Sequence, residues 1–78
     1  MNIYYLSQDV NTDYDTYDSM VVYAETEEHA RQILPHHTNW GGRYGLWANK
    51  PEEVKVSYLG TAPHVTTPGI ILASYNAG

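Results

Sequence analysis

The sequence predicts a single α+β domain, with one short helix packed on a mostly antiparallel sheet of three or four strands in the order β-β-α-β-β. Apolar runs built from strand-forming residues stand on both sides of one capped helical segment. Polar stretches that contain Gly, Pro, Asn or Asp separate these runs. Neither an internal repeat nor a linker interrupts the 78 residues, so we expect residues 1–78 to form one domain.

Two strands are expected before the helix. Residues 2–7 (NIYYLS) and residues 19–25 (SMVVYAE) are rich in β-branched and aromatic side chains. Residues 8–18 between them are polar and rich in Asp, Asn and Thr, which predicts a loop. Two strands joined in this way most simply form an antiparallel pair with a long excursion at one end.

The helix is predicted directly after the second strand. Thr26 is a good N-cap, two glutamates follow it at the positive end of the helix dipole, and Pro35 closes the segment. A narrow apolar stripe at i, i+3 and i+4 is expected to face the sheet: Ala30, Ile33 and Leu34. About two turns cannot stand alone, so packing must hold this helix.

The second half of the chain begins with the longest irregular stretch, residues 36–53, which holds both tryptophans. Alternation in residues 54–59 then predicts a third, half-buried strand. Residues 60–68 are expected to be a loop, punctuated by Gly60 and two prolines. Residues 69–75 (GIILASY) are apolar on both faces and predict a fourth strand in the centre of the sheet.

The chain is acidic, with 4 Lys and Arg against 9 Asp and Glu and a net charge of −5. Such a chain repels phosphate backbones, so direct binding of nucleic acid is not expected, whereas basic proteins are suitable partners. Simple solubility accounts for the same charge. The absence of cysteine excludes disulfides and thiolate metal sites. Neither a signal peptide nor a membrane-length apolar run is visible, so we expect a soluble intracellular protein.

The four aspartates of residues 8–18 first suggest calcium. Asp9, Asn11 and Asp13 match the opening of an EF-hand loop, but Tyr14 stands where Gly is needed and Met20 where a bidentate Glu belongs. Paired carboxylates for Mg²⁺-dependent phosphodiester cleavage are also poorly supported, because all of them lie on one loop with few basic residues nearby. The histidines lack zinc-site spacing. We therefore predict no metal, no cofactor and no catalytic residue.

A partner-binding surface is the remaining interpretation of this tyrosine-aspartate run. Carboxylates spaced along a loop can enter a basic groove that normally takes nucleic acid, and interleaved tyrosines supply contact area. The alternative is a solvated loop whose tyrosines fold back on the sheet. The predicted partner-contacting residues are Asp13, Tyr14, Asp15, Tyr17 and Asp18, together with Trp40, Arg43 and Tyr44 of the second loop.

The second loop allows another hypothesis. Its glycines, its aromatic side chains and Arg43 are groups that hold a nucleotide or a signalling molecule. However, the spacing matches neither a P-loop nor a dinucleotide-binding fingerprint. A loop pinned to the core by Trp47 explains the same residues.

Residues 14–31 (YDTYDSMVVYAETEEHAR) carry a resemblance. They are similar to small proteins of unassigned function from bacteriophages and prophages, which share a YDTYDS-x-VV-x-A core followed by an E-x-x-A-R helix. The likeness extends to Trp47, to the ending ILASYNAG, and to the segment Val54-Lys55-Val56 with Tyr58, Gly60 and Ala62. The resemblance implies a phage origin and leaves the chemistry open.

Small acidic phage proteins with α+β folds often resemble anti-defence factors such as anti-CRISPR proteins. By that analogy we expect a non-enzymatic accessory protein that binds and inhibits a host protein in the host cytoplasm. The ligand-binding module is the alternative. Self-association into a homodimer through an exposed edge strand is compatible with both.

Overall fold

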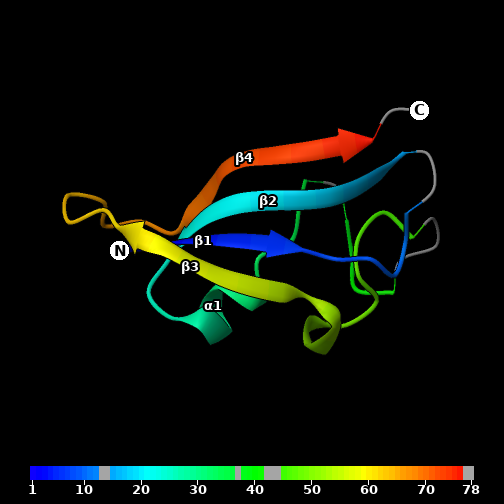
Figure 1. Cartoon of the computed structure of the whole chain (residues 1–78), viewed down its shortest axis with the longest axis horizontal. Helices are drawn as coiled ribbons and strands as arrows, with labels where there is room; N and C mark the ends of the chain where they lie inside the picture. The colour runs from blue at the N-terminus through cyan, green and yellow to red at the C-terminus, as the bar shows by residue number, and fades with distance from the viewer. Residues whose placement is uncertain (13–14, 37, 42–44, 77–78) are drawn as a thin grey trace.

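A computed structural model describes residues 1–12, 15–36, 38–41 and 45–76, and it confirms the α+β class. The first pair, β1 (Asn2–Ser7) and β2 (Thr16–Ala24), is antiparallel and occupies the centre of the sheet. The other strands, β3 (Lys55–Thr61) and β4 (Gly69–Asn76), flank it, so the order is β3-β1-β2-β4 (Figure 1). Helix α1 (Glu27–Arg31) and a 3-10 turn, η1 (Pro51–Glu53), complete the described elements.

The prediction that residues 69–75 form a central strand is wrong. Strand β4 pairs with β2 alone and forms one edge of the sheet. Its apolar side chains are spread over both faces: Ile70 packs against the core, whereas Leu72 is 66% exposed. The apolar residues on both faces of β4 therefore reflect a second sheet face that is uncovered. They do not indicate that β4 has a neighbouring strand on each side.

Strand β2 begins three residues earlier than predicted. Thr16 and Tyr17 pair with Asn76 and Tyr75 of β4, after which a bulge at Asp18 shifts the register. The polar composition of these residues hides their strand character, because the long-range ladder to β4 supplies the hydrogen bonds that a loop would lack. The excursion between β1 and β2 is correspondingly shorter.

The helix is also shorter than predicted, but its cap is as expected. The Thr26 hydroxyl accepts a hydrogen bond from the His29 amide at 3.1 Å. Arg31 ends the helix and donates to the Val54 carbonyl at 2.7 Å, which ties α1 to the start of β3. Ala30 is fully buried beneath the sheet. None of the helices in the described ranges is long and apolar enough to cross a membrane.

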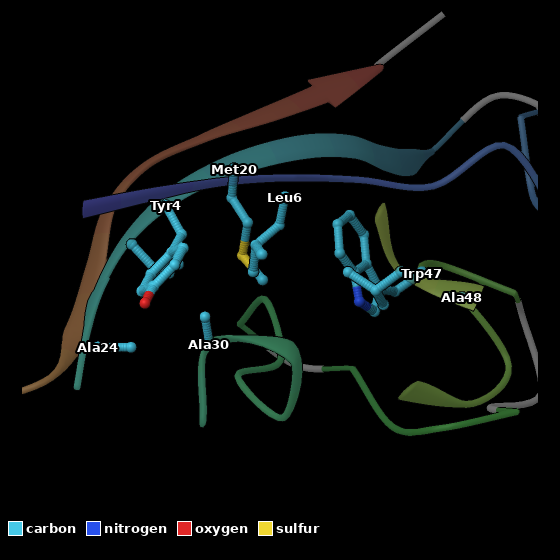
Figure 2. Close-up of a cluster of buried hydrophobic side chains, with 9 residues drawn as sticks. Tyr4, Leu6, Met20, Ala24, Ala30, Trp47 and Ala48 are labelled. Atoms are coloured by element: carbon cyan, nitrogen blue, oxygen red, sulfur yellow. The ribbon is translucent and has the colours of Figure 1, made fainter. Parts of the chain in front are cut away.

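The core lies on a single side of the sheet. Strands β1 and β2 direct apolar side chains toward α1 and the loop that carries Trp47, as Figure 2 shows. Trp47 is the largest fully buried side chain, so the prediction that it pins the long second loop to the core is confirmed. The buried set comprises Tyr4, Leu6, Met20, Val22, Ala24, Ala30, Trp47, Ala48 and Val54.

Candidate partner-binding end of the sheet

The two loops that the sequence singled out meet at one end of the sheet (Figure 1). The Asn11 side-chain amide donates to the Trp47 carbonyl at 2.6 Å, and the Tyr17 amide donates to the Leu46 carbonyl at 2.8 Å. We call the described parts of residues 8–18 and 38–50 the loop end. Because backbone groups of both loops take part, the loops are held in a fixed relation to each other.

Gln8 organises the first of these loops. Its buried side chain donates to the carbonyls of Asn11 at 2.7 Å and Tyr17 at 2.8 Å. Its side-chain oxygen accepts from the amides of Val10 and Asn11, both at 2.9 Å. A single amide thus satisfies four backbone groups that no strand ladder reaches.

Gly45 permits the close approach of the second loop. Its φ of 56° is in the left-handed region, and a Cβ added there would lie 2.9 Å from the Asn11 side-chain oxygen. Both the backbone conformation and the contact therefore favour glycine. The junction between the two loops depends on this missing side chain.

Asp15 stands at the turn into β2 and is exposed. Its φ of 59° is a conformation that Asp and Asn tolerate better than most residues. Its amide donates to the Asn76 carbonyl at 2.6 Å, and its carboxylate is close enough to the Tyr75 hydroxyl to affect the pKa of that group. Partial desolvation, and after it the negative charge of Asp15, raise the pKa of Tyr75.

The other described members of the predicted surface differ in exposure. Tyr17 is half-buried, packs against the core, and lies with its ring centroid 4.9 Å from that of Tyr75. Asp18 is exposed and accepts from the Ser19 hydroxyl at 3.2 Å. Trp40 is half-buried against the core. The predictions for Asp13, Tyr14, Arg43 and Tyr44 fall outside the described residues.

The residues that suggested calcium have other partners. Lys55 lies 2.7 Å from the Asp9 carboxylate, and its hydrogen bond and positive charge lower the pKa of Asp9. Asn11 directs its amide nitrogen toward the Trp47 carbonyl. Within the described ranges no three His, Asp or Glu side chains gather in a way that could hold a metal ion.

Fewer aromatic side chains are available to stack on a ligand than the sequence suggested. Trp47 is only 1% exposed and offers no stacking face. Its indole nitrogen is buried and has no acceptor among the described residues. Of the two tryptophans, Trp40 alone retains partial exposure.

Sequence reasoning missed the residues that build the loop end, Gln8 and Asn11. A single polar side chain directly after a strand carries little signal, because Gln and Asn are equally common on solvated loops. The nearest signal is the spacing, since Gln8 and Asn11 are three residues apart, as in a side-chain-capped turn.

The loop end presents exposed carboxylates on a backbone that is held by hydrogen bonds from Gln8 and Asn11. Such groups accept strong hydrogen bonds from Lys and Arg side chains, and their negative potential attracts basic surfaces. Comparisons of the chain with protein families, with curated proteins and with solved structures find no match.

Proposed function

We propose that the chain is a non-enzymatic bacteriophage accessory protein that binds and inhibits a basic host protein in the host cytoplasm. An anti-defence role of the anti-CRISPR kind is the specific form of this proposal. The resemblance of residues 14–31 to phage and prophage proteins supports the origin, and the net charge of −5 supports the sign of the partner.

The observation that carries the proposal is the rigid support beneath two exposed carboxylates, Asp15 and Asp18. Hydrogen bonds fix the backbone on both sides of them: from Asp15 to Asn76, from Tyr17 to Leu46, and from Gln8 to the Asp18 carbonyl at 3.2 Å. A surface that is ordered before it binds loses less conformational entropy on association.

The mechanism of inhibition in this proposal is electrostatic occlusion. The carboxylates take the positions that phosphates occupy in the partner's basic groove, and long-range attraction accelerates the encounter. The proposal requires no reaction at the loop end.

The test begins with a pull-down from host lysate using the full chain, with the captured protein identified by mass spectrometry. Association is then measured for the wild-type chain and for a variant with Asp13→Asn, Asp15→Asn and Asp18→Asn. Asparagine keeps the left-handed conformation at residue 15 accessible. We expect at least a tenfold slower association and a flatter dependence on salt.

A matched control separates position from net charge. Glu25→Gln, Glu28→Gln and Glu52→Gln remove the same three charges from exposed side chains elsewhere on the chain. The control is expected to associate nearly as fast as the wild type. Equal slowing in both variants, or unchanged kinetics in the aspartate variant, contradicts a localised acidic surface. A rise in melting temperature with free nucleotides favours the ligand-binding alternative instead.

A further inference from the structure

The sheet has a second face that the described part of the chain leaves uncovered. The strand register places Tyr5 beside Val21 and Val21 beside Leu72, and it places Ile3 beside Tyr23. These residues alternate with the core residues of the same strands, so they point away from α1 and Trp47. We call Ile3, Tyr5, Val21, Tyr23 and Leu72 the open face. Figure 2 shows the labelled core side chains gathered on the opposite side.

The open face is apolar where solvent normally selects polar residues. An antiparallel sheet with one solvated face usually alternates apolar core residues with polar outward ones. Here Tyr5 is 40% and Leu72 66% exposed, and the other three are half-buried by their neighbours. Serines border this patch on one side: Ser7, Ser19 and Ser74 form the next outward row. Apolar centres with polar rims are typical of protein interfaces.

Charge indicates which partner fits. Neither Asp nor Glu occurs among the open-face residues or the serine row, and the neighbouring Lys55 is paired with Asp9. Residues 56–78 contain no Lys, Arg, Asp or Glu. The acidic helix residues Glu27 and Glu28 belong to α1, on the covered side. The face therefore offers no carboxylate to a basic partner. Two copies of this acidic chain can approach each other through it without bringing like charges together.

The size of the face sets the strength of the contact. Strand spacing of about 4.8 Å and a rise of about 3.3 Å per residue give the whole four-stranded sheet face roughly 400 Å² per copy. Burying this area on both copies removes about 800 Å² in total, which is below the roughly 1,200 Å² of a standard specific interface, so we expect a weak dimer. A chain of 78 residues with a one-sided core also gains stability from association.

We propose that the open face is a homodimer interface, on which a second copy packs face to face about a two-fold axis. The two sheets then form a sandwich about 10 Å thick, with the α1 helices on its outer surfaces. Both loop ends remain at the periphery, so the dimer leaves the acidic surfaces accessible. This proposal does not rest on the proposed function.

Sedimentation equilibrium of the full chain over a range of micromolar concentrations tests the proposal. We expect a mass that rises toward twice 8.8 kDa with concentration. Tyr5→Glu and Leu72→Glu each bury a carboxylate between the two open faces without a positively charged partner. We therefore expect each to weaken the dimer at least tenfold. His29→Glu adds the same charge to the exposed helix on the other side and is expected to remain dimeric. Far-UV circular dichroism confirms that each variant is folded.

Strand β1 distinguishes face packing from edge pairing. Tyr5 lies on β1, which is an inner strand and pairs on both sides within the sheet, so its side chain takes no part in backbone pairing at the β3 or β4 edge and Tyr5→Glu leaves an edge-to-edge dimer intact. A folded Tyr5→Glu variant that still dimerises overturns the proposal, and so does a wild-type chain that stays monomeric throughout. The salt dependence distinguishes dimerisation through the open face from partner binding at the acidic loop end. Added salt is expected to preserve or strengthen the dimer and to weaken binding of the basic partner. The homodimer is also overturned if the wild-type chain is monomeric and Leu72→Glu abolishes capture of the host protein.

Discussion

At the scale of single residues, Asp15 has two structural functions beside its exposed charge. Its backbone makes the left-handed turn into β2 and donates to the Asn76 carbonyl, and its negative charge raises the pKa of Tyr75. The predicted partner-binding residue therefore also joins the start of β2 to the end of β4. Asparagine at this position keeps the turn and removes the charge, which allows the two functions to be separated.

The Tyr75 hydroxyl provides a pH-dependent readout of this contact. Its pKa is raised in the folded chain, so its contribution to stability is fully present below the unfolded-state pKa of about 10 and is lost as the pH rises through the folded value. We expect Asp15→Asn to lower the Tyr75 pKa, as measured by NMR titration of tyrosine ring carbons. Asp18→Asn is the control and is expected to have a smaller effect. A Tyr75 pKa that does not respond to Asp15→Asn contradicts the contact.

At the scale of elements, the loop between β1 and β2 is held by one side chain. Gln8 substitutes for a strand ladder by bonding four backbone groups. The Asn11 side chain then connects this loop to the second loop by donating a hydrogen bond to the Trp47 carbonyl. The loop end thus has a defined structure, although only its residues 16–18 belong to a strand.

Replacing Gln8 by leucine tests this dependence. The side chain keeps its size, but four backbone groups lose their partner, and we expect a loss of about 2–4 kcal/mol in the free energy of unfolding. Urea denaturation measures the loss. Gln32→Leu, at an exposed position, is the control and is expected to change stability by less than about 0.5 kcal/mol. A loss for Gln8→Leu as small as that of the control contradicts the proposed organisation of the loop.

At the scale of the whole molecule, a one-sided core gives the domain a small margin of stability. Among the residues that the structure describes, nine buried apolar residues form the cluster, and Trp47 supplies the largest fully buried side chain from outside the strands. A domain of this size is typically stable by only about 4–12 kcal/mol. The second loop is therefore part of the core as well as part of the loop end.

Two substitutions at Trp47 separate volume from hydrogen bonding. Trp47→Ala is expected to cost about 3–5 kcal/mol, which unfolds a large share of the molecules near physiological temperature. Trp47→Phe is expected to cost at most about half as much, because the indole nitrogen has no acceptor among the described residues. Thermal and urea unfolding measure both. Equal losses for Phe and Ala would indicate that the indole N–H has a partner after all.

The sequence was sufficient for the fold class, for the β1–β2 pair and for the Thr26 cap, because each is encoded by neighbouring residues. It was insufficient for the edge position of β4, since an apolar strand has the same composition whether a strand or solvent lies beside it. The extension of β2 to Thr16 depends on pairing with Asn76, at the far end of the chain. The roles of Gln8 and Asn11 depend on contacts between loops, which no local pattern records.

The strand order has a consequence for how the chain folds. The central pair β1 and β2 is close in sequence, whereas β3 and β4 each join it only after a long loop has closed, as in the pairings of Asn2 with Thr61 and of Thr16 with Asn76. Closing such loops costs entropy before any contact compensates it, so sheets of this kind fold slowly. The sheet is therefore expected to grow outward from its centre. Until β4 docks, the outer edge of β2 remains open to pairing with another chain.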